Sequence, residues 1–373
     1  MKQTWGLHLQ RLVHCVTDGV HFKLGVHDVD KWYLDNLVCP VTKKSLEYKE
    51  GMLFSPCGRS YPVVDGVPVM LLEDVEQTQN IVLPSIARAK SELDSIDMRA
   101  EHLYLESLGI SDQEREGIVQ LESAGKSKVD PVVAYMVAAT SGNSYKSLLG
   151  KLREYPIPEL RLPEGKGKMF LDVGCNWGRW SIAASRKGYS VVGIDPSLGA
   201  VMAAKRVAES LGLPIHFIVG DARFLPFPDN TFDTVFSYSV LQHFSKENSN
   251  TVLKEVSRVL RLGGVSLIQM AHVFGLRSMQ HQIMRGFRDT KAFEVRYWSI
   301  PELYRIFRTS IGKSTISVDC YFGLGLQGND RRFMPGTIKF IITISELLRK
   351  ISHIFPFLKY VADSLYVKSI CQK

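Results

Sequence analysis

Residues 169–174, MFLDVG, begin a series of short apolar runs that alternate with helical patterns. The later runs are SVVGID at 190–195, IHFIVGD at 215–221, FDTVFSYS at 232–239 and GVSLIQM at 264–270. Helical spacing fills the intervals at 179–187, 200–212 and 246–261. Because strands that alternate with helices require crossover connections, the pattern predicts a mostly parallel, doubly wound α/β sheet.

The length and composition indicate a folded protein with more than one unit. The chain has 373 residues, ordinary apolar and charged fractions and a mean hydropathy near zero, which favours two domains. It contains no uninterrupted apolar run long enough for a membrane span, and the first 25 residues lack a signal-peptide pattern. Six scattered cysteines fit free thiols in a reducing compartment. We therefore expect a cytoplasmic protein.

Four regions are expected along the chain. They are an N-terminal segment at 1–76 with a small β-rich module at 34–73, a helical linker at 77–160, the α/β core at 161–275, and a basic, helical C-terminal region at 276–373. The Pro- and Gly-rich stretch YPIPELRLPEGKGK precedes the first strong strand and marks the start of the core.

Acidic residues close three successive strands of the core. Asp172 ends the first strand and is followed by a loop from Gly174 to Gly178, while Asp195 and Asp221 end the second and third. Ligands of such sheets bind beyond the carboxyl ends of the strands. Asp195 lies 21 residues beyond Gly174, the spacing at which a second-strand acid reaches ribose hydroxyls. Each acid taken alone is more often a turn or a helix cap, but three in register predict a nucleoside site.

A dinucleotide dehydrogenase is the main competing interpretation of this loop. Pyrophosphate binding uses G-x-G-x-x-G, whereas Asn176 and Arg179 occupy the second and third glycine positions here. A cofactor that carries an amino acid and no phosphates needs only small residues and an acidic or carbonyl oxygen for its ammonium group. The loop therefore favours that kind of cofactor.

With these motifs, residues 170–270 resemble the class I methyltransferases, in the subgroup that acts on small molecules. The resemblance implies a Rossmann-like sheet, S-adenosylmethionine as cofactor, and a structural turn at 258–264. It also implies that Asp172 and the loop hold the methionine part, that Asp195 holds the ribose, and that Asp221 and Ala222 read adenine. Asn176 departs from the usual central glycine of that family. The implied cofactor residues are Asp172, Gly174, Cys175, Asn176, Gly178, Asp195, Pro196, Asp221 and Ala222.

Candidates for the chemistry and for the acceptor follow the fourth and fifth strands. His243 lies just beyond the fourth strand and is our candidate base for a hydroxyl acceptor, although a helix cap or packing role is as common. Tyr238 and His272 are weaker candidates, since each fits a buried hydrogen bond equally well. Arg296, Tyr297 and Trp298 are candidate substrate contacts, with packing against the sheet as the alternative.

The module at 34–73 resembles the small zinc-ribbon family that accompanies or activates certain tRNA and translation-factor methyltransferases. Zinc ribbons need four ligands, commonly from two C-x-x-C pairs. Only Cys39 and Cys57 are present, because Thr42 and Phe54 stand where the partner cysteines would fall. We therefore expect no metal, and a β-rich element that packs a small core or docks a substrate or partner.

The positive charge is concentrated at the C-terminal end. From Arg277 to Lys373 there are 16 Lys and Arg against 7 Asp and Glu. The stretch IKFIITISELLRKISHIFPFLKYVADSLYV places apolar residues at helical spacing between cations, as a core helix, a dimer helix or a helix on a membrane surface would.

The favoured function is an O-methyltransferase for a sugar, a glycan-lipid or a secondary metabolite, with a nucleotide sugar or a lipid-linked glycan as the partner molecule. The alternatives are an RNA (tRNA) methyltransferase, suggested by the pI of about 9.0, and a non-catalytic cofactor-binding scaffold or activator. Against nucleic acid, the sequence has no interleaved basic and aromatic RNA-binding module.

Overall fold

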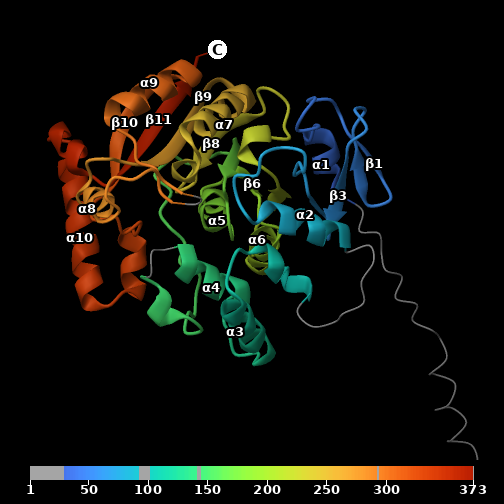
Figure 1. Cartoon of the computed structure of the whole chain (residues 1–373), viewed down its shortest axis with the longest axis horizontal. Helices are drawn as coiled ribbons and strands as arrows, with labels where there is room; N and C mark the ends of the chain where they lie inside the picture. The colour runs from blue at the N-terminus through green and yellow to red at the C-terminus, as the bar shows by residue number, and fades with distance from the viewer. Residues whose placement is uncertain (1–28, 92–100, 141–143, 292–293, 373) are drawn as a thin grey trace, which may run out of the picture.

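The computed structural model describes residues 29–91, 101–140, 144–291 and 294–372. Its centre is a seven-stranded sheet with the order β10-β11-β9-β8-β5-β6-β7 (Figure 1). The strands are β5 (Met169–Val173), β6 (Ser190–Asp195), β7 (Ile215–Val219), β8 (Phe232–Ser237), β9 (Leu260–Ala271), β10 (Gly312–Cys320) and β11 (Ser364–Cys371). The first five pair in parallel, which confirms the predicted α/β fold.

The sheet extends beyond the core range expected from the sequence. β11 inserts antiparallel between β9 and β10, so two strands come from the C-terminal region at 276–373. The connection order reverses at β5, whose neighbours are β6 on one side and β8 on the other. In open α/β sheets this reversal opens a crevice at the carboxyl ends of the strands, which places the candidate site beyond β5.

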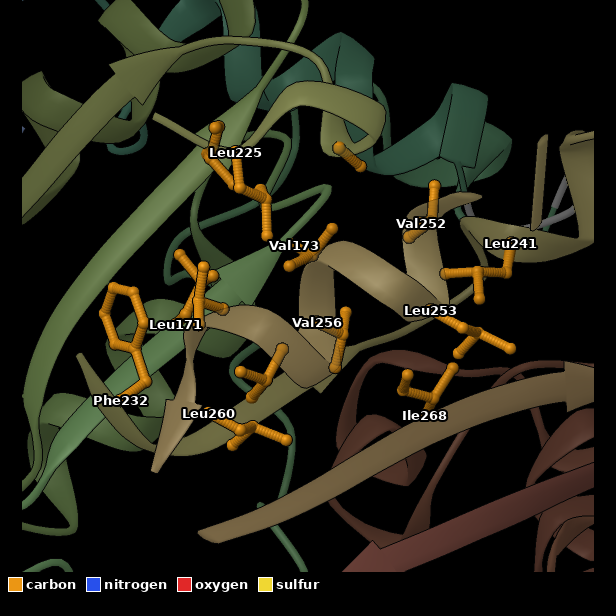
Figure 2. Packing of buried hydrophobic residues seen from close by; sticks show 14 of the residues in the cluster. Leu171, Val173, Leu225, Phe232, Leu241, Val252, Leu253, Val256, Leu260 and Ile268 are labelled. Carbon is orange, nitrogen blue, oxygen red and sulfur yellow. The ribbon is translucent and has the colours of Figure 1, made fainter. Parts of the chain in front are cut away.

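Helices cover both faces of the sheet. On one face lie α7 (Lys246–Val259) and α9 (Ile300–Ser310), and on the other α5 (Arg179–Arg186) and the C-terminal helix α10 (Gly336–Ile351) (Figure 1). α7 is capped by the Ser245 hydroxyl and buries Val252, Leu253 and Val256 against the sheet (Figure 2). This spacing of apolar residues is the helical period, and it explains why the sequence predicts a helix at 246–261.

A substitution at Leu253 would test how α7 packs on the sheet. Its side chain is 1% exposed within the largest apolar cluster, so Leu253→Ala removes buried apolar surface and leaves a cavity (Figure 2). We expect a loss of about 2–5 kcal/mol of unfolding free energy, measured by denaturant titration. Leu262 is 72% exposed, so Leu262→Ala should change stability by less than about 0.5 kcal/mol. Equal effects of the two substitutions would contradict this packing.

The N-terminal module is β-rich, as the sequence predicts, and forms a four-stranded antiparallel sheet. Its elements are α1 (Lys31–Asn36), β1 (Glu47–Lys49), β2 (Met52–Phe54), β3 (Ser60–Val64) and β4 (Val67–Pro68); residues 1–28 of this region lie outside the described part of the chain. Val69 bridges Val219 in parallel, and the Met70 amide donates to Val219 O at 2.7 Å. The module thus continues the main sheet at its β7 edge.

The two cysteines of this module lie side by side. The Sγ atoms of Cys39 and Cys57 are 3.8 Å apart, and the Tyr61 hydroxyl is 3.4 Å from Cys39 Sγ. Burial raises the pKa of the Cys39 thiol, but hydrogen bonds from Ser55, Thr42 and Tyr61 outweigh it and lower the pKa to about 6. Among the described residues, no three His, Cys, Asp or Glu side chains are grouped to hold a metal ion. The zinc-ribbon resemblance stays a prediction.

The linker at 77–160 is partly helical, with α2 (Val82–Ser91), α3 (Asp112–Ser123), α4 (Pro131–Thr140) and the short 3-10 turns η1 (Glu101–Leu103), η2 (Leu105–Ser107) and η3 (Lys146–Leu148). The helix expected at 81–96 is described only as far as Ser91, and the helical stretch expected at 144–155 forms the single turn η3.

Two serines of this linker form hydrogen bonds with the first turn of α6 (Leu198–Ser210). The Leu198 amide donates to Ser85 Oγ at 3.1 Å, and the Gly199 amide donates to Ser107 Oγ at 2.6 Å. The linker therefore secures the helix that follows Asp195.

The C-terminal region contains α8 (Leu276–Met284), α10, and the 3-10 turns η6 (Gly328–Phe333) and η7 (Pro356–Val361). The helical pattern expected at 338–367 forms three separate elements: α10 ends at Ile351, η7 follows, and Ser364 begins β11, whose Leu365, Tyr366 and Val367 are buried. Within the described residues, no helix combines the length and the apolarity that a membrane crossing requires.

Candidate functional site

The loop between β5 and α5 is built on left-handed backbone positions. Gly174 has φ +75°, and a Cβ atom there would lie 2.2 Å from Val240 Cγ2. Gly178, with φ +82°, is the N-cap of α5. Asn176 has φ +49°, a conformation that asparagine tolerates better than most residues, and its side chain accepts the Trp177 amide at 2.8 Å. Asparagine at this position therefore meets the same backbone requirement as glycine.

Asp172 is buried under this loop. Its side chain is 1% exposed and accepts a hydrogen bond from the Ser181 hydroxyl, in the first turn of α5, at 2.6 Å. Burial, together with the nearby Asp195 carboxylate, raises the pKa of Asp172 to about 7, although the Ser181 hydroxyl opposes the shift. Ser181 is not among the residues predicted from the sequence; a hydroxyl nine residues after the acid, on the inner face of α5, is the only signal for it.

Asp195 ends β6 directly beside the loop, since Ile194 pairs with Val173 of β5. One carboxylate oxygen accepts the Asn176 amide at 3.0 Å and the other accepts the Ser197 amide at 3.0 Å. Burial raises the pKa of Asp195 to about 6, because desolvation outweighs these two bonds. Each oxygen keeps a lone pair for a further donor.

Two expected residues flank these acids. Cys175 is 2% exposed, and burial raises the pKa of its thiol well above the usual value, so it is a neutral, packed side chain. Pro196 is half-buried and separates Asp195 from Ser197 at the start of α6.

Asp221 is held differently from the other two acids. It caps η4 (Ala222–Phe224) and forms an ion pair with Arg223, whose side chain donates to Asp221 at 2.7, 3.0 and 3.2 Å. Arg223 also donates to the backbone oxygen of Glu76, which follows the N-terminal module, at 2.8 Å. The carboxylate of Asp221 is thus engaged by its neighbour, and the reading of adenine by Asp221 and Ala222 stays a prediction.

The arrangement fits a cationic, phosphate-free nucleoside cofactor. Two buried carboxylates lie at one tight loop, in which a Cβ atom at Gly174 would collide with Val240. A sulfonium or ammonium group would stabilise the ionised forms of Asp172 and Asp195, whereas a pyrophosphate would be repelled by them. The donor set therefore matches S-adenosylmethionine better than a dinucleotide.

The raised pKa values predict that cofactor binding depends on pH. Between pH 6 and 7 a fraction of Asp172 and Asp195 is protonated in the free protein, and a bound cation lowers both pKa values. Binding should therefore release protons in this window, and affinity should rise with pH until it levels off above about 7. Calorimetry in two buffers of different ionisation enthalpy measures this release. A binding heat that is independent of the buffer at about pH 6.5, between the two raised pKa values, would contradict the prediction.

His243 and Arg296 are brought together at the carboxyl edge of the sheet. His243 ends η5 (Leu241–His243), directly after β8, and its backbone oxygen accepts Arg296 Nη1 at 2.7 Å. The Arg296 amide donates to Gln242 O at 2.8 Å. Tyr297 instead contacts α8 and the residue after it. Its hydroxyl lies 3.3 Å from His281 Nδ1, and the Arg285 guanidinium lies over its ring. The predicted base, His243, and one predicted substrate contact, Arg296, are therefore in direct contact.

His272 and Trp298 form a second pair, joined by a parallel bridge. His272 Nδ1 donates to Ala362 O at 3.0 Å, so in the neutral ring Nε2 carries the lone pair. His272 is fully buried, and burial lowers its pKa. His272 Nε2 and Trp298 Nε1 are buried polar atoms without a partner among the described residues. Both atoms therefore lack the hydrogen bond that buried polar groups usually make.

Tyr238 has a partner of its own. Its hydroxyl donates to the buried Asp319 of β10 at 2.9 Å, and the same carboxylate accepts Ser364 Oγ and Arg161 Nη1. This network joins four segments that are distant in sequence, and it gives Tyr238 the buried hydrogen bond that is the alternative to a substrate contact.

A comparison with known families agrees with this geometry. Residues 170–264, about a quarter of the chain, match the family described as "Methyltransferase domain". The fold and the site therefore define a methyltransferase-type α/β domain, and this match confirms the expected cofactor, S-adenosylmethionine, at the level of the domain class.

Individual relatives cover only part of this chain. Demethylmenaquinone methyltransferase of Bacillus licheniformis is 38% identical over 117 residues, 31% of this chain and 48% of that protein. Ajmaline N-methyltransferase of Rauvolfia serpentina is 30% identical over 115 residues, 30% of this chain and 38% of that protein. A solved SAM-dependent methyltransferase from Methanosarcina mazei is similar at 24% identity with a TM-score of 0.36, covering 43% of this chain and 91% of that one. The chain thus spans less than half the length of these two curated relatives, whose names give different acceptors.

Proposed function

We propose that this chain is an S-adenosylmethionine-dependent methyltransferase that acts on a hydroxyl of a small acceptor, a sugar, a glycan-lipid or a secondary metabolite. The observation that carries the proposal is the convergence of Asp172, the 174–178 loop and Asp195 at the point where the strand order reverses. The domain match over the same residues supports it.

The residues of the chain have separate tasks in this proposal. When bound, S-adenosylmethionine supplies an electrophilic methyl group. Asp195 accepts the ribose hydroxyls with its two remaining lone pairs, while its bonds to Asn176 and Ser197 fix the orientation of the carboxylate. Asp172, oriented by Ser181, places a negative charge beneath the cationic end of the cofactor. Holding the methyl group in line with the acceptor supplies most of the rate enhancement of such a transfer.

The proton of the acceptor hydroxyl goes to a nearby base. His243 follows β8 and His272 follows β9, so both lie at the edge that carries the cofactor loop. His272 has its tautomer fixed by Ala362 O, and its buried Nε2 atom has no hydrogen-bond partner among the described residues. We keep His243 as the first candidate for the base and treat His272 as the residue that orients the acceptor.

A methyl-transfer assay tests the proposal. The full chain is incubated with S-adenosylmethionine labelled in the methyl group and with four acceptor pools: nucleotide sugars, lipid-linked glycans, small secondary metabolites and tRNA. We expect label in one of the first three pools, lost in His243→Ala and retained in a surface control, Lys313→Ala, on β10. Label in tRNA alone would replace the proposed acceptor with RNA, and cofactor binding without transfer to any pool would favour a non-catalytic scaffold.

A further inference from the structure

Three C-terminal elements expose apolar side chains on one side of the molecule. We call this set, together with the turn at 352–355 that joins the last two elements, the apolar face; the elements are α8, α10 and η7, which Figure 1 shows in orange and red. Large apolar residues on it are mostly more than half exposed, including Leu276, Ile283, Met284, Phe340, Leu347 and Ile354. Contiguous exposure on this scale is unusual for a soluble surface and marks an interaction site.

The exposed side of α10 is a regular stripe. Phe340, Ile344, Leu347 and Ile351 follow one another at intervals of four, three and four residues, which places them on one face of the helix, and Ile354 lies in the turn just beyond its end. Phe340 and Ile354 are 67% and 74% exposed. The opposite side of α10 already packs inward through Ile342 and Ser345. The helix therefore carries a second apolar side that the described residues leave uncovered.

A groove joins α8 to α10. It has a volume of about 510 Å³ and is lined by Leu276 and Arg277 of α8, by Phe322, and by Phe340 and Ile341 of α10. The exposed residues of the two helices are thus parts of one surface. On the other side of α10, Lys339 lines a separate cleft of about 720 Å³ together with Arg186, Arg331 and Arg332.

The charge around the apolar face is strongly positive. Residues 276–291 and 336–361 together contain eight Lys and Arg but only Asp289 and Glu346 as acids. Glu346 pairs with Arg161 and Arg349, and Glu294, just beyond these ranges, pairs with Arg288, so the remaining Lys and Arg side chains carry the positive charge of this face. Apolar side chains flanked by long cationic ones are the pattern of surfaces that enter the headgroup region of a bilayer, where the cations reach lipid phosphates.

The face lies next to the candidate site. α8 begins five residues after β9 ends, and its first turn is fixed by Asp363, whose Oδ1 accepts the Arg277 and Ser278 amides at 2.7 and 2.8 Å. The backbone oxygen of Ala362, the preceding residue, accepts the hydrogen bond from His272 Nδ1. β9 is two strands from β5, or roughly 10 Å across the sheet. The same edge of the sheet therefore carries the cofactor loop and the start of the apolar face.

We propose that the apolar face docks this protein on an anionic lipid bilayer. A second copy of the chain is a poorer occupant, because self-association would bring two strongly positive surfaces together. If the proposed function holds, docking brings the region around His243 and Arg296 close to molecules anchored in the membrane. Among the proposed acceptor classes, this favours lipid-linked ones. That last step rests on the proposed function, whereas the docking does not.

Vesicle flotation of the full chain tests the docking without cofactor or acceptor, so its result is independent of methyl transfer. Vesicles of phosphatidylcholine with phosphatidylglycerol should bind the protein at least about tenfold more tightly than phosphatidylcholine alone, and added salt should reduce the difference. The double variant Phe340→Glu, Ile354→Glu should lose at least about tenfold in binding. Leu262→Glu, a matched exposed leucine at the start of β9, should bind as the unchanged protein does.

Thermal melting checks that the variants remain folded, and light scattering reports the oligomeric state. Absence of binding to anionic vesicles would overturn the proposal, as would equal binding by the double variant. A dimer that Phe340→Glu converts to a monomer would assign the apolar face to a second copy instead. Conversely, vesicle binding by a chain that does not bind S-adenosylmethionine would leave the docking standing and remove the proposed function.

Discussion

Replacing Asp195 with alanine is expected to weaken S-adenosylmethionine binding by about a hundredfold, which calorimetry measures directly. The carboxylate is the acceptor for two ribose hydroxyls in the proposed complex, and two hydrogen bonds to a charged group, at the lower end of their usual range of roughly 1.5 kcal/mol each, correspond to about a hundredfold. It also accepts the Asn176 and Ser197 amides, which position the loop and the first turn of α6. Its removal therefore costs both cofactor contacts and loop order.

Asp233 provides the matched control for this substitution. It lies at the opposite end of the sheet, where its carboxylate accepts the Met169 amide at 2.8 Å and pairs with Arg261. Asp233→Ala should leave the affinity for S-adenosylmethionine within about twofold, because it touches no part of the loop. Unchanged affinity in Asp195→Ala, or an equal loss in both variants, would refute the assignment of Asp195.

Replacing Gly174 with alanine should abolish measurable cofactor binding and lower stability by about 2–5 kcal/mol. The positive φ angle is unfavourable for alanine, and the new Cβ atom would lie 2.2 Å from Val240 Cγ2. The loop must then shift away from β8, which moves the Asn176 amide from Asp195. Calorimetry and denaturant titration report the two effects separately.

A control at Gly263 separates the effect of the positive φ angle from that of the clash. Gly263 has the same φ of +75°, but no atom lies within 4 Å of the place that a Cβ would take. Gly263→Ala should lose only the conformational contribution of about 1–2 kcal/mol and keep full cofactor affinity. Adding Val240→Ala to Gly174→Ala should restore part of the binding, because it removes the clashing methyl groups. Failure of this rescue, with a stable double variant, would show that the clash is not the cause.

The sequence is a good guide wherever a single element carries its own signal. The strands from β5 to β9 and the helices between them follow from apolar runs and helical periods, because each buries a face that the residue pattern displays. The loop and Asp195 are predictable for a similar reason, since strand ends in a parallel sheet meet at one edge. Asparagine can stand at position 176 in place of glycine because it tolerates the left-handed backbone there.

Features that depend on distant segments are not predictable in this way. The helical pattern at 338–367 wrongly includes the start of β11, because that short alternating run follows a true helix and its partners, β9 and β10, lie far away in sequence. The Arg223–Asp221 pair and the bonds from Ser85 and Ser107 to α6 depend on how the N-terminal module and the linker dock. The bond from Tyr238 to Asp319 likewise exists only once β10 has joined the sheet.

The most direct test of the central claim is calorimetric titration of the full chain with S-adenosylmethionine and S-adenosylhomocysteine. We expect one site for each, with an affinity that falls about a hundredfold in Asp195→Ala and persists in Asp233→Ala. S-adenosylhomocysteine lacks the sulfonium charge, so its binding should depend less on pH between 6 and 7. Absence of binding for both ligands by the folded protein would contradict the assignment of this site.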